Sequence, residues 1–385
     1  MLDENKQDIK IKEIESKTLL RPAKKIDSWF LASYGMNIYR GCQHACIYCD
    51  GRTEKYQVEG EFGKQTTVKI NAHDLLASEL DTLFANHKNL SGLIMIGGGV
   101  GDSYQQIEND YKLTRQILEI IGKYKAPIHL LTKSTLVLRD MDIIKKINKH
   151  SKAILSMSFS SVDDQISKLF EPGVPPPSER LQALEKYKKE GLACGMYLMP
   201  TIPYITDTPQ QIEKCFKEAS KIGLDFLVYA GLTLKKGRQK QFFYDVLADH
   251  YPEFIDDYKD LYAEENSWGS PQRDYMKSYS QFLIQLSRKY MLPLRFPLDL
   301  VSNYVNPKDR VIVTLEQIDY LRKLMGQRSS FSYTARNISQ IKEELYQMRF
   351  CLQSIKGVGP VTERIIQDIL QNGCSSYYQK LLYGK

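Results

Sequence analysis

The functional signal of this chain is concentrated in the stretch Asn37-Ile-Tyr-Arg-Gly-Cys42-Gln-His-Ala-Cys46-Ile-Tyr48-Cys49. Its three cysteines have the spacing C-x3-C-x2-C. A cubane iron–sulfur cluster has four irons and is ordinarily held by four thiolates. Three thiolates from one short loop leave one iron open to another ligand. The spacing therefore predicts a [4Fe–4S] cluster on Cys42, Cys46 and Cys49.

Two other uses of these cysteines are less favoured. A zinc site usually takes four Cys or His ligands, and the nearby fourth candidate, His44, lies inside the cysteine loop itself. Disulfides are disfavoured because seven cysteines is an odd number and the N-terminal segment has no apolar signal core. These features indicate a reducing compartment, and we expect a cytoplasmic protein.

The composition is that of an ordinary globular protein, with 385 residues, 42 % hydrophobic and 26 % charged. The sequence has no run of about 18 apolar residues, so no membrane span is expected. The net charge of +7 is modest and by itself says little about a polyanionic partner. The segment 301–385 is more basic, with 12 Lys or Arg against 7 Asp or Glu.

Short apolar runs alternate with amphipathic segments beyond the cysteine loop. The pattern predicts strands at Thr66–Ile70, Gly92–Ile96, Ile128–Thr132, Ala153–Phe159, Ala193–Met199 and Asp225–Ala230. Helices are predicted at Ala72–Phe84, Asp110–Lys123, Asp140–Asn148, Ser178–Glu190, Pro209–Ile222 and Arg238–Ala248. Such alternation is typical of βαβ units on a parallel sheet. Six units are too few for a closed eight-stranded barrel, so an α/β fold with an open partial (β/α)6 barrel is expected.

The expected organisation is an N-terminal tail (1–27), the partial barrel (28–250), a helical extension (251–330) and a C-terminal region (331–385). In barrels of this kind, ligand sites collect where strands end. A glycine run, Gly97-Gly98-Gly99, follows one strand, and Asp102 comes soon after it. Glycines let a backbone approach a ligand closely, although the run could be a tight turn only.

Polar residues follow the next two strands. Lys133 could pair with a carboxylate, whereas its neighbour Ser134 could be a site residue or a helix N-cap. Ser158 occupies the equivalent place on the following strand. The proline-rich loop 171–178 could shape a substrate pocket or merely connect two elements.

Several stretches together resemble one known family. They are NIYRGCQHACIYCDGR, GDSYQQIENDYKLTRQILE, LLTKSTLVLRDMDII, FEPGVPPPSERLQAL and LMPTIPYITD, between about residues 28 and 245. They are similar to the radical S-adenosylmethionine (SAM) superfamily, in its spore photoproduct lyase and "DNA repair photolyase" branch. The resemblance implies a radical SAM barrel, a [4Fe–4S] cluster, SAM as cofactor, an electron donor such as flavodoxin or ferredoxin, and a 5′-deoxyadenosyl radical as the reactive species.

The resemblance also implies roles for individual residues. The residues implied to contact SAM are Tyr48, Gly97, Gly98, Gly99, Asp102, Lys133 and Ser158. Spore photoproduct lyase has a cysteine after its glycine turn that returns a hydrogen atom, but the segment GGGVGDSYQ has none. Tyr104 and Cys194 are the candidate substitutes for it, although Cys194 could equally be a buried, inert thiol.

The C-terminal stretch Leu352–Ile366 resembles a helix–hairpin–helix of DNA repair proteins. Gly357 and Gly359 would form a tight turn whose amides bind phosphate, with Lys356 and Arg364 adding positive charge. The alternative is an ordinary helical hairpin with a glycine turn.

The leading interpretation is a radical SAM enzyme that acts on DNA, by lesion repair or by nucleotide modification. One alternative keeps the enzyme but gives it a peptide or small-molecule substrate. The other is a non-catalytic iron–sulfur protein that binds nucleic acid and senses redox state.

Overall fold

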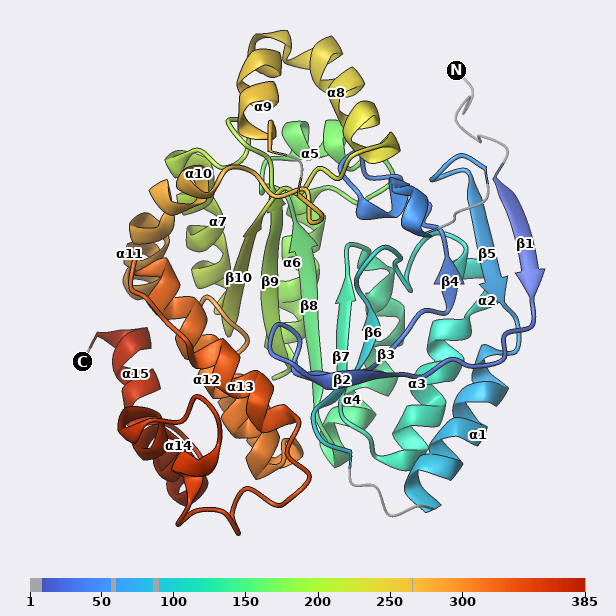
Figure 1. Ribbon diagram of the computed structural model, residues 1–385. Coiled ribbons are helices and arrows are strands. Elements are labelled where there is room, and N and C mark those ends of the chain that lie inside the picture. Colours follow the sequence, from blue (N-terminus) through green and yellow to red (C-terminus); the bar gives the residue numbers. More distant parts are fainter. Residues whose placement is uncertain (1–8, 57–59, 86–89, 265, 385) are drawn as a thin grey trace.

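A curled sheet of seven strands forms the centre of the computed structural model, which describes all residues except 1–8, 57–59, 86–89, 265 and 385 (Figure 1). The strand order is β10-β9-β8-β7-β6-β3-β2. The bounds are β2 Arg21–Asp27, β3 Ala32–Met36, β6 Leu93–Gly97, β7 Ile128–Thr132, β8 Ala153–Phe159, β9 Ala193–Thr201 and β10 Phe226–Gly231. All pairs are parallel except β2 with β3. The expected partial (β/α)6 barrel is confirmed.

Amphipathic helices cover the convex face of this sheet: α1 Ala72–Ala85, α3 Leu113–Tyr124, α4 Met141–His150, α6 Pro177–Lys189 and α7 Pro209–Ile222 (Figure 1). Local sequence sets their ends. In α7, Thr208 caps the first turn, Pro209 opens the helix, and Gly223 ends it at φ 75°. The helix expected at Asp110–Lys123 is divided, because Lys112 adopts a left-handed φ of 52° between α2 (Glu108–Tyr111) and α3.

One predicted barrel strand was wrong. β5 (Gln65–Lys69) belongs to a separate three-stranded sheet, between β1 (Lys10–Ile14) and β4 (Tyr39–Arg40). Its place in the barrel is taken by β3, whose sequence Ala-Ser-Tyr-Gly-Met has no apolar run that could have announced a buried strand. The cysteine loop therefore lies in the connection between two strands of the small sheet, β4 and β5.

The expected N-terminal tail (1–27) contains two of these strands, although residues 1–8 lie outside the described part. Both β1 and β2 lie at an edge of their sheet and carry mostly exposed residues, including Pro22 in β2. Charged residues and proline are typical of edge strands, which need no apolar pattern. For that reason the sequence pattern did not indicate them.

Beyond β10 the described chain is helical, and the part from Phe296 onward closes the concave face of the sheet. Its helices are α8 Arg238–His250, α9 Ile255–Leu261, α10 Arg273–Ser278, α11 Ser280–Tyr290, α12 Pro307–Leu324, α13 Phe331–Ser339, α14 Pro360–Asn372 and α15 Ser376–Tyr383. Buried side chains of α12 share one apolar core with inward-facing residues such as Tyr197 and Phe226. No described helix is both long enough and apolar enough to cross a membrane.

The C-terminal hairpin differs from a helix–hairpin–helix. The element before its turn is a single 3₁₀ turn, Leu352–Ser354, and the element after it is α14. Gly357 has a φ of 92° and its carbonyl accepts a hydrogen bond from Thr334 Oγ1 at 2.8 Å. Lys356 and Arg364 are exposed. In Figure 1 this hairpin lies at the opposite end of the molecule from the carboxyl ends of the barrel strands.

Replacing Leu315 by alanine tests whether α12 and the barrel form one cooperative unit. Leu315 is fully buried in the core that α12 shares with the sheet, so Leu315→Ala should lower the free energy of unfolding by about 2–5 kcal/mol. Urea denaturation followed by circular dichroism measures this. Lys259→Ala, which removes an exposed ion pair with Asp256, should cost less than about 1 kcal/mol. A second transition that Leu315→Ala leaves unchanged would show that the barrel unfolds separately from α12.

Candidate active site

A cavity of about 390 Å³ opens where the parallel strands end. Its walls come from the cysteine loop, the glycine loop after β6 and residues at the carboxyl ends of β7 to β10. The sequence-predicted residues that line it are Cys42, Cys46, Cys49, Tyr48, Gly98, Gly99, Asp102, Lys133 and Ser158. The structure thus brings the three cysteines and most of the predicted SAM contacts to one place.

The three cysteines fit an iron–sulfur cluster. None is in a disulfide. Burial raises the pKa of all three thiols, and that of Cys46 reaches about 12. Such thiols become thiolates only beside a compensating positive charge, which iron supplies. The described residues hold no ready-made cage for a single ion. A cluster does not need one, because its cysteines bind different irons.

Hydrogen bonds from distant segments hold the cysteine loop in shape. Arg52 donates from Nε to the Cys46 carbonyl at 3.0 Å and from Nη2 to the Ala45 carbonyl at 2.7 Å. Ala45 itself has a left-handed φ of 51°. Fully buried Gln105 donates to the Gly41 carbonyl at 3.2 Å and accepts from the Gln43 amide at 2.9 Å. Protein groups therefore hold the backbone of the loop through hydrogen bonds at several points.

The proline-rich loop clamps the cysteine loop from the other side. The Gly173 amide donates to the His44 carbonyl at 3.1 Å, and His44 Nδ1 lies 3.0 Å from the Gly173 carbonyl oxygen. A Cβ at Gly173 would lie 2.4 Å from the Gln43 carbonyl oxygen, so only glycine permits this approach. None of residues 171–178 lines the cavity, and the loop supports it indirectly, through these contacts with the cysteine loop.

Asp102 joins three walls of the cavity. Its carboxylate lies 3.0 Å from His44 Nε2 and accepts hydrogen bonds from Thr132 Oγ1 at 2.7 Å and from the Lys133 amide at 2.8 Å. Burial raises its pKa, but His44 and the amide donors outweigh that effect, so the pKa is lowered overall. Asp102 is therefore a charged anchor whose oxygens are already bonded to protein groups.

A second buried carboxylate, Glu171, lies beneath Tyr48. It accepts from Lys133 Nζ at 2.9 Å, from the Tyr48 hydroxyl, and from the guanidinium of Arg180, whose side chain is fully buried. Burial alone would raise the pKa of Glu171, but Arg180 and Lys133 lower it well below its usual range. The network contains two cations and one carboxylate.

Three of the residues predicted to contact SAM also contact other parts of the protein. Lys133 Nζ also donates to Ser158 Oγ at 2.9 Å, and Ser158 Oγ donates to the Met199 carbonyl at 2.9 Å. Gly97 does not line the cavity, because it packs against β7, where a Cβ would meet the Leu131 carbonyl oxygen at 2.4 Å. Ser134 caps the following 3₁₀ helix, as its alternative interpretation predicted.

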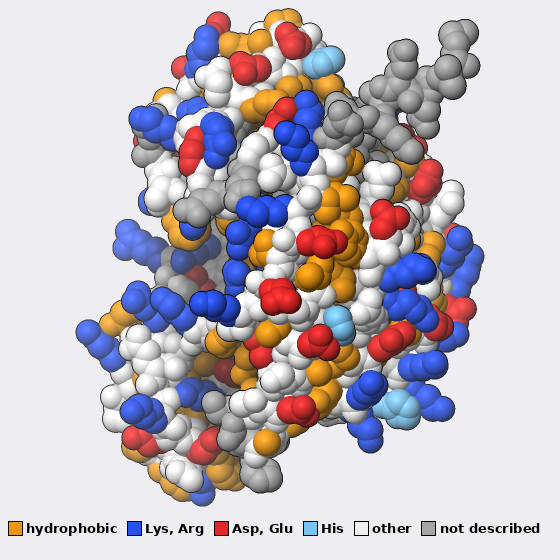
Figure 2. Space-filling model, turned by 90° about the vertical axis from the view of Figure 1, so that its right-hand side faces the viewer, with side chains coloured by type: hydrophobic (Ala, Val, Ile, Leu, Met, Phe, Trp, Pro, Cys, Tyr) orange, Lys and Arg blue, Asp and Glu red, His pale blue; other side chains and the backbone are white. Residues whose placement is uncertain are grey.

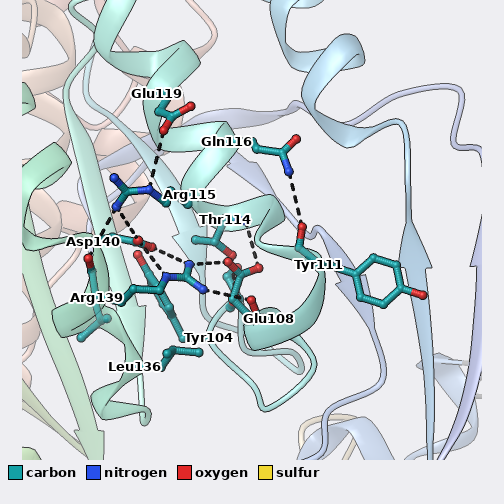
Figure 3. A network of polar contacts seen from close by, with 12 residues as sticks. Tyr104, Glu108, Tyr111, Thr114, Arg115, Gln116, Glu119, Leu136, Arg139 and Asp140 are labelled. Atoms are coloured by element: carbon teal, nitrogen blue, oxygen red, sulfur yellow. Dashed lines mark hydrogen bonds and ion pairs between the residues drawn. The ribbon is translucent and has the colours of Figure 1, made fainter.

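Tyr104 is not a cavity residue, which corrects its assignment as a hydrogen donor. It is 1 % exposed and lies in the outer apolar core beside Arg139 and Asp140, within the polar network of Figure 3. That network centres on buried Glu108, which accepts from Tyr39 and Arg139. Tyr104 thus faces the helical layer, away from the cysteines.

Cys194 is corrected in the same way. It lies on β9, and its side chain belongs to the outer core with Met196 and Leu198, whereas Ala193 and Tyr197 belong to the inner core. Side chains alternate across a strand, so Cys194 points to the helices. Burial, the main cause, raises the pKa of its thiol above the usual range. The inert interpretation of Cys194 fits the structure.

Three buried residues of the site, Glu171, Arg180 and Gln105, could not be predicted from the sequence. Glu171 and Arg180 lie nine positions apart in a stretch quoted for its family resemblance, but charged residues are usually exposed and nothing local marks them as a buried pair. Gln105 follows the glycine loop. Polar side chains in loops are usually exposed, so the sequence does not indicate that Gln105 is buried.

The family model that matches is the radical SAM superfamily, over residues 36–219, a range that holds all three cysteines. The uncharacterized protein MJ0683 of Methanocaldococcus jannaschii is 34 % identical over 246 residues, which cover 64 % of this chain and 85 % of that protein. The chain belongs to the radical SAM superfamily. Membership implies both SAM and an iron–sulfur cluster, and the residues around the cavity fit them.

Other relatives of this radical SAM protein are also uncharacterized. The protein Rv2578c of Mycobacterium tuberculosis is 29 % identical over 60 % of this chain and 67 % of its own length. Among solved structures, a single-site mutant of spore photoproduct lyase has a TM-score of 0.57 at 17 % identity and covers 74 % of this chain and 82 % of that one. A double mutant of the same lyase, with bound AdoMet and dinucleoside spore photoproduct, has a TM-score of 0.51 at 20 % identity, covering 71 % and 77 %. At such identities the likeness is one of fold.

Gly173→Ala tests the clamp on the cysteine loop. The added methyl group would meet the Gln43 carbonyl oxygen, so the loops must separate at a cost of about 1–3 kcal/mol. We expect lower stability to urea and less iron bound per chain after anaerobic reconstitution. Gly122→Ala is the matched control. Gly122 lies within α3, and a Cβ there would be 3.6 Å from Ile147 Cγ1 of α4, which is an ordinary contact. This substitution should stabilise the helix by about 0.5–1 kcal/mol. Equal iron content in both variants would contradict the clamp.

Glu171→Gln tests the buried ion network. Loss of the carboxylate leaves Arg180 and Lys133 without their counter-charge, which should lower the free energy of unfolding by about 3–5 kcal/mol. The pKa of Glu171 is lowered in the folded state, so its contribution is complete above the unfolded pKa, near 4.3, and is lost as the pH falls below it. The unfolding free energy of the wild type should therefore decrease more steeply below about pH 4.3 than that of the variant. Parallel pH profiles would contradict this assignment.

Proposed function

We propose that this protein reductively cleaves SAM at a [4Fe–4S] cluster on Cys42, Cys46 and Cys49 and acts on a nucleotide of DNA, by lesion repair or by nucleotide modification. The observation that carries the proposal is the meeting of three unpaired cysteines, a glycine loop and Lys133 around one cavity. When bound, the cluster and SAM supply a 5′-deoxyadenosyl radical. The protein positions these groups and keeps water away from them.

The chain's own residues divide this work. Tyr48 lines the cavity and lies over Lys133, with Nζ 5.6 Å from the ring centre. Glu171 uses one oxygen for Tyr48 and Lys133 together, so two proposed SAM contacts share one buried support. Gly98 and Gly99, both at left-handed φ, line the cavity and let the backbone come close to a ligand there. Apolar lining residues such as Phe30 and Leu131 exclude water.

DNA is proposed as substrate on two grounds. A neighbour in fold, spore photoproduct lyase, has been solved with a dinucleoside photoproduct bound. In addition, Lys and Arg side chains gather around the indentation at the left of Figure 2, a surface that suits a polyanion. A nucleotide in duplex DNA would have to leave the stack to reach the cavity, at a cost of a few kcal/mol. An acidic electron donor such as flavodoxin or ferredoxin would also suit the positive charge.

The proposed substrate is not spore photoproduct itself. Apart from Cys42, Cys46 and Cys49, no cysteine in the described part of the chain lines the cavity, so no thiol is available to return a hydrogen atom. The C-terminal hairpin, with Lys356, Gly357, Gly359 and Arg364, is proposed to contact the phosphates of flanking DNA, because in Figure 1 it lies at the opposite end of the molecule from the carboxyl ends of the barrel strands.

Quantifying 5′-deoxyadenosine tests the proposal. Anaerobically reconstituted, reduced protein is incubated with SAM alone and with single-stranded, duplex or ultraviolet-irradiated DNA. We expect product that rises at least about tenfold with one form of DNA, and loss of all product in Cys46→Ala. Cys351→Ala is the matched control, because Cys351 is an exposed thiol outside the cavity.

Two other outcomes would indicate a different function. Product that rises with peptides and not with DNA would assign a different substrate class. An intact cluster that yields no product with any substrate, but whose oxidation state changes DNA affinity, would indicate a redox sensor.

A further inference from the structure

A second cavity adjoins the proposed reaction cavity. It measures about 220 Å³ and shares three lining residues with its neighbour: Tyr56, Val100 and Gly101. Its charged lining residues are Arg21, Arg40, Lys55 and Lys69, and we call it the basic pocket. No carboxylate of the described residues lines it. A cavity that holds four cations without a counter-charge is suited to an anion.

Separate elements bring these cations together. Arg21 begins β2, Arg40 ends β4, and Lys69 ends β5, while Lys55 lies in the 3₁₀ helix Glu54–Tyr56. In the antiparallel pair of β4 and β5, Arg40 is opposite Thr67, so Lys69 is its diagonal neighbour on the same face. Arg40 also lies two residues before Cys42. The fold therefore places the basic pocket directly beside the cysteine loop.

Lys69 is the most unusual member, because it is only 3 % exposed and yet has no ion pair or side-chain hydrogen bond within the described residues. Burial lowers its pKa to about 8, and Arg21 and Arg40 contribute to this lowering, whereas Glu79 opposes the shift. The carboxylate of Glu79 is already engaged by the amides of Leu19 and Leu20, at 2.9 and 2.7 Å. A buried cation of this kind is unfavourable unless an anion joins it.

We propose that the basic pocket binds a phosphate group of the DNA strand whose nucleotide occupies the reaction cavity. The inference rests on the proposed function and adds to it the place where the strand is anchored. Guanidinium groups match phosphate oxygens in pairs, and lysines add point charges. A phosphate held here positions the strand without reading its sequence. The shared wall at Val100 and Gly101 sets which nucleotide beside that phosphate reaches the cavity.

The experiment measures DNA affinity with the full chain and a labelled 12-nucleotide single strand, by fluorescence anisotropy over a range of salt concentrations. In Arg21→Gln plus Arg40→Gln, we expect affinity at 0.15 M salt to fall about tenfold and the slope of log affinity against log salt to decrease by about one. Both side chains are exposed, so the variant should fold normally. Arg21→Lys plus Arg40→Lys should restore the slope and most of the affinity.

The matched control, Lys146→Gln plus Lys149→Gln, removes the same charge from exposed positions of α4, on the convex side. Its affinity should change less than about twofold. A single neutral methylphosphonate linkage at the anchored position should weaken wild-type binding about as much as the double Gln variant does, and should add no further loss in that variant.

Each failure has its own signature. Wild-type DNA binding that the double Gln variant leaves unchanged would overturn this inference and leave the proposed function standing. Tight binding of inorganic phosphate, with DNA affinity unchanged in the variant, would assign the pocket to a free anion and overturn it too. A wild-type chain that binds no DNA would overturn the proposed function, and this inference with it.

Discussion

The buried ion network of Glu171 with Lys133 and Arg180 is the interaction on which the site depends. Glu171 follows α5 (Asp164–Phe170) and begins the proline-rich loop, and Arg180 lies in α6 of the same βα unit, whereas Lys133 follows β7, so one carboxylate joins two successive βα units. Because all three charges are withdrawn from water, each needs the others in place. The same carboxylate holds Tyr48 of the cysteine loop. The position of the cysteine loop thus depends on the same carboxylate that holds Lys133 and Arg180 together.

This coupling explains why the cysteine loop is rigid although it has little regular structure. Asp102 ties it to the ends of β6 and β7, Gly173 packs against its backbone, and Arg52 bonds its carbonyls. A cluster that must accept an electron and present one iron to a ligand benefits from thiolates that do not move. The same supports leave the other side of the loop free to share a wall with the basic pocket.

Much of the fold followed from the sequence because its signals are local. The bounds of β7, β8 and α7 agree with expectation to the residue, since apolar runs and a Pro–Gly pair of helix ends mark them. The C-x3-C-x2-C spacing likewise singled out cysteines that do line one cavity. β2 and β3 escaped prediction because edge strands and small-residue strands have no such local signal.

Spacing along the chain was enough to indicate the family, the cysteines suited to a cluster and the alternation of strands and helices. The direction in which each side chain faces depends on packing in three dimensions. Tyr104 and Cys194 had suitable chemistry but lie on the helical side, because strand alternation and packing turn them away from the cavity. Glu171, Arg180 and Lys69 looked like surface charges, and burial by segments distant in sequence made them important. Burial depends on contacts between distant segments, which spacing along one chain does not encode.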